Sequence, residues 1–283
     1  MRWEGQEQSD NVEDRRGMRM PGGRGAGLGC GGILLVLGIS YLTGSDPTQL
    51  LRLLQQSQPV EQQAGPAPAG PPAHDRQGDF ARTVLKSTEQ VWGAIFAESG
   101  QRYEEPKLVL FDGEVESACG YTTSAVGPFY CPADRKLYLD FSFFQELAQK
   151  FGAPGEFAQA YVIAHEIGHH VQNLLGIADQ VTEAQQRAGR RQANALSVGM
   201  ELQADCLAGV WAVHANQTKK WLEPGEVESA LTAAAAIGDD RLQKMSRGYV
   251  QPESWTHGSS EQRVTWLRRG MQTGQVGSCR TLQ

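Results

Sequence analysis

The sequence has no excess of basic residues: its 26 lysines and arginines are outnumbered by 32 aspartates and glutamates, for a net charge of −6. This balance argues against nucleic acid as a partner, because phosphate binding needs a surplus of positive charge. The five cysteines include no CxxC pair, which argues against a zinc site made of cysteines. No internal repeat is present, and 283 residues, 40% of them hydrophobic, suffice for one sizeable core with extensions.

Charged residues are absent from 25–45, and 33–42 is the strongly apolar centre of this stretch. A helix of this length crosses a hydrocarbon core of roughly 30 Å, so we expect a single transmembrane helix over 25–45 that attaches the protein to the cell membrane. Four arginines between residues 15 and 24 precede it, which predicts a cytoplasmic N-terminus and a periplasmic or extracellular main domain. A cleaved signal peptide is the alternative, although no small-x-small cleavage site follows the apolar run.

The remaining chain divides by composition. Residues 1–24 are charged and glycine-rich, so we expect a disordered cytoplasmic tail there. Residues 46–78 are rich in Gln, Pro and Ala, which is typical of a flexible linker, and the folded domain then covers 79–283.

Within that domain, hydrophobic periodicity predicts a first helix over 80–98. Residues 107–111 and 136–140 have the pattern of strands, with turns or a hairpin between them. A helix over 141–151 and several later helices complete the pattern. The expected class is therefore α+β, mostly helical with a small sheet or hairpin, behind the transmembrane helix.

Four cysteines lie outside the apolar segment and allow three pairings. Cys119 with Cys131 would close a short loop inside the hairpin, and Cys206 with Cys279 would tie the C-terminus to a helix. Four buried thiols are the alternative. Disulfides persist in oxidising compartments, so the first interpretation agrees with a domain outside the cytoplasm.

Residues 165–169 read His-Glu-Ile-Gly-His, within an apolar stretch over 157–175 that contains no proline. On a helix, His165 and His169 share a face and can bind one zinc ion. Glu166 lies on the neighbouring face, where a carboxylate can accept a proton from a zinc-bound water. The pattern therefore predicts one zinc ion per chain with its own general base.

The third ligand is expected from a mostly apolar helix that begins near Asn194. Glu201 and Asp205 lie four residues apart on this helix, and buried carboxylates need charged or hydrogen-bonding partners. Glu201 as the zinc ligand and Asp205 as the acceptor of a histidine N–H would satisfy both.

Other histidine schemes fit less well. A metzincin would have a glycine three residues and a histidine six residues after the motif, where Gln172 and Leu175 stand. His170 points elsewhere on the helix and is expected either to be structural or to support the ligands from behind. His214 is interpreted as a surface histidine, and His74 falls in the linker.

Taken together, these motifs resemble the bacterial neutral zinc metallopeptidase family, whose members are membrane-anchored and carry a zincin-type domain. The resemblance spans the last two thirds of the chain and implies a zincin-like fold over 79–283. Its matching pieces are Cys119-Gly120, Gly127-Pro128-Phe129-Tyr130-Cys131-Pro132, Leu137-Tyr138-Leu139-Asp140, Ala164-His165-Glu166-Ile167-Gly168-His169-His170, Glu201-Leu202-Gln203-Ala204-Asp205 and Thr256-His257-Gly258-Ser259-Ser260.

The predicted function is zinc-dependent endopeptidase activity on a peptide or protein substrate, with Glu166 as the general base and acid. His257 is the first candidate for a donor to the oxyanion, because Thr256-His257-Gly258 resembles a downstream histidine segment of related membrane zincins. Equally, this segment fits a helix N-terminal turn capped by Ser259 or Ser260.

Several alternatives stay open. Tyr130 and Tyr138 are weaker candidates for the oxyanion donor. Residues 121–130 could pair with an extended substrate as an edge strand, or form only a disulfide-locked loop. The chain could also be a membrane-anchored binding or scaffold protein with structural or vestigial zinc, or a zinc amidohydrolase that cleaves another amide.

Overall fold

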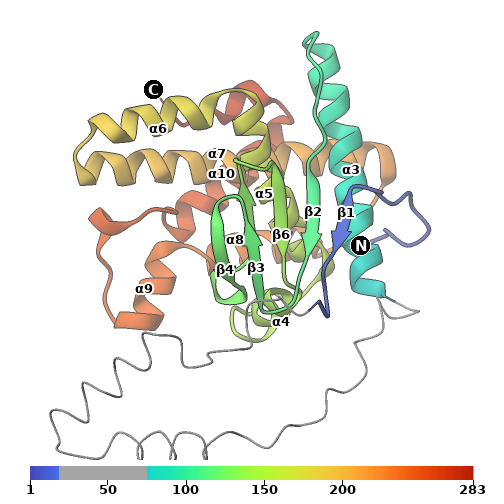
Figure 1. Ribbon diagram of the computed structural model, residues 1–283, viewed down its shortest axis with the longest axis horizontal. Coiled ribbons are helices and arrows are strands. Elements are labelled where there is room, and N and C mark those ends of the chain that lie inside the picture. Colours follow the sequence, from blue (N-terminus) through green and yellow to red (C-terminus); the bar gives the residue numbers. More distant parts are fainter. Residues whose placement is uncertain (19–74, 283) are drawn as a thin grey trace, which may run out of the picture. The chain divides into compact units, whose positions relative to one another are not determined.

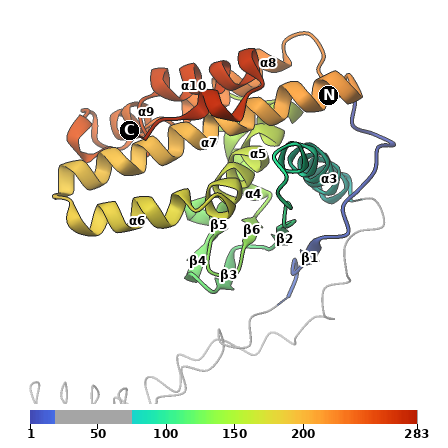
Figure 2. The same cartoon turned by 90° about the horizontal axis from the view of Figure 1, so that it is seen from above.

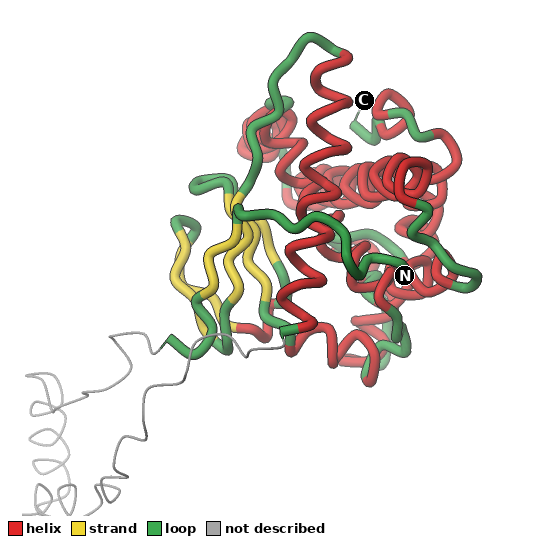
Figure 3. The backbone as a smooth tube through the Cα atoms, turned by 90° about the vertical axis from the view of Figure 1, so that its right-hand side faces the viewer, coloured by secondary structure: helices red, strands yellow, loops and turns green. Residues whose placement is uncertain are grey.

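The computed structural model describes residues 1–18 and 75–282. Residues 1–16 and the chain after the undescribed stretch form one folded unit, whose elements are labelled in Figure 1. The helices lie on one side of this unit and the strands on the other (Figure 3). The helices are α3 (Arg76–Glu98), α4 (Ser142–Gln149), α5 (Glu156–Leu174), α6 (Ile177–Arg187), α7 (Arg190–Lys219), α8 (Glu226–Ala236), α9 (Asp239–Arg247) and α10 (Ser260–Thr273). The strands are β1 (Val12–Asp14), β2 (Lys107–Leu110), β3 (Glu114–Ser117), β4 (Gly120–Thr123), β5 (Phe129–Cys131) and β6 (Lys136–Leu139).

The main sheet has the strand order β1-β2-β6-β5. β1, β2 and β6 are parallel, whereas β5 is antiparallel to β6 and forms an edge of the sheet. β3 and β4 form a separate antiparallel hairpin. The predicted α+β class, mostly helical with small sheets, is confirmed.

Both faces of the central strands are buried, as their uninterrupted apolar sequences require. Leu108 and Leu110 of β2 face the main core under the helices. Val109 of β2 and Tyr138 of β6 point the other way, into a small second core with Val115 of the hairpin. Alternate side chains of the same strands therefore pack against the helices on one face of the sheet and against the hairpin on the other.

The disordered tail expected over 1–24 is wrong for residues 1–16. Trp3 is only 4% exposed, and its ring packs edge-on against Phe80 of α3 at 5.4 Å. β1 pairs in parallel with β2, and Glu13 of β1 accepts a hydrogen bond from Lys136 at 2.8 Å. Charged residues that suggested disorder, such as Glu13, form ion pairs with distant residues. Because Trp3 and β1 are part of the core and the sheet, the folded unit does not begin at residue 79.

The transmembrane helix expected over 25–45 and most of the linker expected over 46–78 lie outside the described residues. In 1–18 and 75–282, no helix is both long and apolar enough to cross a bilayer.

Close contacts between helices position the site. α10 lies along α7, and α5 crosses between α7 and the sheet (Figure 2). A Cβ on Gly168 of α5 would lie 3.0 Å from the Cα and carbonyl oxygen of Ala204 on α7. A Cβ on Gly270 of α10 would lie 1.9 Å from the carbonyl oxygen of Cys206, so only glycine permits these helices to approach so closely.

Both expected disulfides are present. Cys119–Cys131 joins the end of the hairpin region to β5 across 12 residues. Cys206–Cys279 ties the C-terminal segment to α7 across 73 residues. The alternative of four buried thiols is wrong.

Candidate metal centre

The three predicted zinc ligands converge. His165 and His169 are one turn apart on α5, and Glu201 faces them from α7. One donor atom from each lies within 4.8 Å of the others. The Nε2 atom of His165 is 3.2 Å from Glu201 Oε2, and Nε2 of His169 is 3.4 Å from Glu201 Oε1. The carboxylate thus lies between two imidazoles that meet at an interplanar angle of 88°.

The outer nitrogen of each ring is held by an acceptor. Nδ1 of His165 donates to Asp205 Oδ1 at 2.8 Å, and Nδ1 of His169 donates to Gln172 Oε1 at 2.9 Å. With the proton on Nδ1, the lone pair of Nε2 points at the ligand cluster, as metal coordination requires. The predicted role of Asp205 as acceptor of a histidine N–H agrees with this contact.

The charges around the cluster also fit a cation. Burial lowers the pKa of His165, but the carboxylates of Asp205 and Glu201 outweigh this and raise it to about 10. Burial would raise the pKa of Glu201, but His169 and His165 hold it well below its usual value. The carboxylates therefore favour positive charge at the imidazoles, which a divalent cation would supply. Two imidazoles and one carboxylate are a ligand set that zinc prefers in hydrolases.

Tyr161 and Arg263, which were not predicted from the sequence, lie behind His165 and contact Asp205. Asp205 is fully buried and accepts hydrogen bonds from the Tyr161 hydroxyl at 2.6 Å and from Arg263 Nε at 2.8 Å. Arg263 of α10, 2% exposed, also donates from Nη2 to Asp205 Oδ1 at 2.8 Å. Arg263 is four residues before buried Leu267, so helical periodicity could have placed it on the buried face.

Glu166 lines the same cleft as the ligands and is 9% exposed. Burial raises the pKa of Glu166, although the neighbouring imidazoles of His169 and His165 oppose this. A carboxylate with a raised pKa can accept a proton and return it near neutral pH.

His257 also lines this cleft, with its side chain 52% exposed. Its Nδ1 lies 3.3 Å from Asp239 Oδ1, and this contact raises the pKa of His257. Asp239 Oδ2 accepts the backbone N–H groups of Thr256, His257 and Gly258, which fixes the segment before α10. Asp239 was not among the residues predicted from the sequence. Ser259 is the N-cap of α10 and forms a capping box with Gln262, so the predicted helix turn is confirmed while His257 still faces the cleft.

The two tyrosine candidates have engaged hydroxyl groups. His170 Nε2 faces the carbonyl oxygen of Glu104 at 2.7 Å and must carry its proton there, so Nδ1 accepts from Tyr130 at 2.9 Å. Tyr138 donates to Asp134 at 2.6 Å. Neither hydroxyl is free to stabilise an oxyanion, and His170 contacts Tyr130 and Glu104 without joining the ligand cluster.

The other two histidines do not contribute to the cluster. His214 of α7 makes a hydrogen bond to the carbonyl oxygen of Gly274. His74 lies outside the described residues.

The cleft has a volume of about 620 Å³. Residues 124–130, which lead into and include part of β5, form one wall. Apolar side chains from α4, α5, α9 and the segments after α4 and α8 also line the cleft: Phe143, Phe151, Val162, Ile237 and Leu242. The metal ligands and Glu166 line the same cleft.

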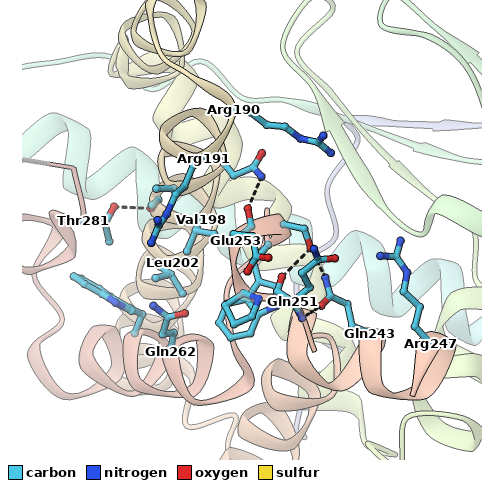
Figure 4. Close-up of a pocket in the computed structure, with 17 residues that line it drawn as sticks. Arg190, Arg191, Val198, Leu202, Gln243, Arg247, Gln251, Glu253, Gln262 and Thr281 are labelled. Atoms are coloured by element: carbon cyan, nitrogen blue, oxygen red, sulfur yellow. Dashed lines mark hydrogen bonds between the residues drawn. The ribbon is translucent and has the colours of Figure 1, made fainter. Parts of the chain in front are cut away.

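A larger cavity of about 1200 Å³ is lined by other residues of α7 and by α9 and α10 (Figure 4). Its lining includes Arg190, Arg191 and Arg247, but none of the residues predicted for the site. The chemistry expected from the sequence thus belongs to the smaller cleft.

Comparisons with known proteins identify the family of the chain. A profile of the family described as "Putative neutral zinc metallopeptidase" matches residues 1–282. The chain is 46% identical over 292 residues to the uncharacterized protein YpfJ of Escherichia coli K12, covering 99% of this chain and 98% of YpfJ. It is 42% identical over 260 residues to the uncharacterized protein Rv2575 of Mycobacterium tuberculosis H37Rv, covering 86% of this chain and 84% of that protein. No solved structure matches the chain at a comparable level. The chain therefore belongs to the neutral zinc metallopeptidase family.

Proposed function

We propose that this protein is a zinc-dependent endopeptidase in which His165, His169 and Glu201 hold one zinc ion. The observation that carries the proposal is the convergence of these three donors in a cleft that also contains Glu166. A bound zinc ion would supply Lewis acidity, which lowers the pKa of a water molecule towards neutrality and polarises a carbonyl group.

Other residues of the cleft transfer the proton, stabilise the oxyanion and orient the ligands. Glu166 accepts the proton of the attacking water and delivers it to the leaving amine. His257 donates from Nε2 to the developing oxyanion, while Asp239 holds Nδ1 and the backbone of residues 256–258. Asp205 and Gln172 hold the two imidazoles so that each Nε2 faces the cluster.

The walls of the cleft favour an extended peptide as substrate. β5 is an edge strand that pairs with β6 on one side, and among the described strands it has no partner on the other. A substrate strand laid along it would gain main-chain hydrogen bonds. The apolar side chains that line the cleft, such as Phe143 and Leu242, would accept a hydrophobic side chain of the substrate.

A Glu166→Gln variant tests the mechanism because it keeps the shape of the side chain and removes the base. We expect purified wild type and variant to bind one zinc ion each, measured by elemental analysis. Cleavage of an unfolded protein such as casein should fall by about 10²–10⁴-fold in the variant.

Proteolysis that survives Glu166→Gln would overturn the assignment of the base. A wild-type protein that binds zinc but cleaves no peptide would favour a binding protein or an amidohydrolase. A wild-type protein that binds no zinc would overturn the proposed function altogether.

A further inference from the structure

His169 is oriented by a neutral side chain, unlike His165. Gln172, one turn later on α5, is fully buried and accepts the Nδ1–H of His169 through its carbonyl oxygen. Its amide nitrogen donates to the carbonyl oxygen of Met200 at 2.8 Å and to Oε1 of Gln203 at 3.0 Å. Gln172 therefore contacts one proposed zinc ligand and also the peptide unit immediately before another, Glu201.

The hydrogen bonds continue from α7 to the C-terminal segment. Gln203 is 7% exposed and donates through Nε2 to the carbonyl oxygen of Cys279 at 3.0 Å. Cys279 is bonded to Cys206, three residues after Gln203 on the same helix. The relay thus runs from His169 through Gln172 and Gln203 to a backbone group that a disulfide holds in place.

Further contacts hold the segment after Cys279 against α7. The Thr281 hydroxyl donates to the carbonyl oxygen of Gly199 at 2.5 Å (Figure 4). A Cβ on Gly199 would lie 2.6 Å from Leu282 Cδ2, so the absence of a side chain leaves room for this residue. The segment therefore packs on α7 within one turn of Glu201.

The direction of each amide in the relay is fixed. His169 must donate from Nδ1 if its Nε2 is to bind a metal, so the Gln172 carbonyl faces the ring and its NH₂ group faces α7. A flipped Gln172 would place its carbonyl against two acceptors, the Met200 carbonyl and Gln203 Oε1. Gln203 in turn presents its carbonyl to Gln172 only while its NH₂ group has the Cys279 carbonyl to bind.

We propose that the C-terminal segment, held by Cys206–Cys279, positions the zinc ligand His169 through Gln203 and Gln172 and thereby raises the affinity of the site for zinc. This inference rests on the proposed zinc site. Hydrogen-bonding partners of metal ligands typically contribute 10–100-fold to metal affinity. The effect should be largest at Gln172, which touches His169, and smaller at Gln203 and at the disulfide.

Zinc affinity of the full chain, measured by competition with a chromogenic chelator, tests the inference without reference to catalysis. We expect Gln172→Leu to weaken zinc binding by about 10–100-fold, and Gln203→Leu and the double variant Cys206→Ala/Cys279→Ala by about tenfold. The double variant Cys119→Ala/Cys131→Ala is the matched control, because it removes a disulfide that is not hydrogen-bonded to the relay. Its zinc affinity should stay within twofold of wild type.

The unfolding free energy of each metal-free variant is measured in parallel. Gln203→Leu keeps both disulfides, so it tests the relay even if the protein without Cys206–Cys279 does not fold. Unchanged zinc affinity in Gln203→Leu would overturn the inference and leave the proposed function intact. Equal weakening in the Cys119/Cys131 control would also overturn it, because the loss would then reflect general destabilisation. Wild-type protein that binds no zinc would instead overturn the proposed function.

Discussion

Arg263 and Asp205 form a buried ion pair directly behind His165. The Tyr161 hydroxyl is hydrogen-bonded to both members of the pair. The side chains of Arg263 and Asp205 are only 3% and 0% exposed. Burial opposes ionisation of Asp205, yet Arg263 and His165 lower its pKa to about 2. Removing one member of such a pair leaves an uncompensated charge in the core.

For this reason we expect Arg263→Met to lower the free energy of unfolding by about 3–5 kcal/mol, measured by urea denaturation of metal-free protein. Arg268→Met on the exposed face of the same helix is the control and should change it by less than about 0.5 kcal/mol. If both variants lowered the free energy of unfolding equally, the buried ion pair would contribute no more to stability than an exposed arginine does.

A second residue-scale prediction separates the two interpretations of residues 256–260. If His257 donates to the oxyanion, His257→Ala should reduce kcat by about 10²–10³-fold with little change in KM or in stability. Ser259→Ala removes the cap of α10 and should cost about 1 kcal/mol of stability without a comparable loss of kcat. Peptide hydrolysis and thermal unfolding of both variants provide the measurement. A normal kcat in His257→Ala would leave the segment with a capping role alone.

The spacing of the motif was enough to predict His165, Glu166 and His169, because helical periodicity places them without knowledge of the rest of the fold. Glu201 and Asp205 were predictable because carboxylates in an apolar helix need partners. Tyr161, Asp239 and Arg263 act through contacts between different elements, and so does Gln172 in its hydrogen bonds to α7, although its contact with His169 lies within α5. Their roles could not be assigned until those elements were placed in space.

At the scale of elements, the site depends on how closely α5 and α7 approach. Gly168 lies inside the zinc motif and faces the backbone of Ala204, one turn from Glu201. A side chain there would push α7 away and carry Glu201 from the two imidazoles. The motif thus encodes a helix contact as well as a set of ligands.

We expect Gly168→Ala to lower the free energy of unfolding by about 1–3 kcal/mol and to weaken zinc binding as well. Gly93→Ala is the matched control, since it lies within α3 and its new Cβ would meet no atom within 4 Å. It should stabilise the protein by about 0.5–1 kcal/mol, because alanine favours helix over glycine. Urea denaturation and chelator competition measure both effects. A Gly168→Ala protein with unchanged zinc affinity would contradict the proposed link between helix spacing and the site.

Most elements were predictable from local patterns, with errors at their ends. α5 was expected over 157–175 and covers Glu156–Leu174, and the first helix begins at Arg76 instead of 80. α7 begins at Arg190, whereas the predicted start was near Asn194. The first turn was missed because its residues are mostly polar and show no apolar periodicity. β1 was missed since a strand of three residues owes its existence to its neighbour β2.

At the scale of the whole molecule, β1 constrains how the chain can relate to a membrane. Residues 12–14 are hydrogen-bonded to β2, so both lie on the same side of any membrane. A single crossing by 25–45 would separate them, and the two arrangements exclude each other in one molecule. We propose that the whole unit, β1 included, lies in an oxidising compartment, as its two disulfides favour.

Labelling of single cysteines tests this arrangement. In a Cys30→Ser background, Gln8→Cys and Gln272→Cys place a thiol at an exposed position on each side of residues 19–74. We expect a membrane-impermeant maleimide to label both equally in intact bacterial cells, with a cytoplasmic protein as the unlabelled control. Labelling of Gln272→Cys alone would support a single crossing and show that β1 does not pair with β2 in the cell.

The distance of β1 from β2 along the chain also bears on the order in which the strands of the main sheet pair. β2 and β6 are separated by a much shorter stretch of chain than β1 and β2, and the entropy of closing a loop grows with its length. We therefore expect β1 to join the sheet after β2 and β6 have paired. Detachment of β1 would uncover the edge of β2, so the pairing of this three-residue strand protects that edge from other extended chains.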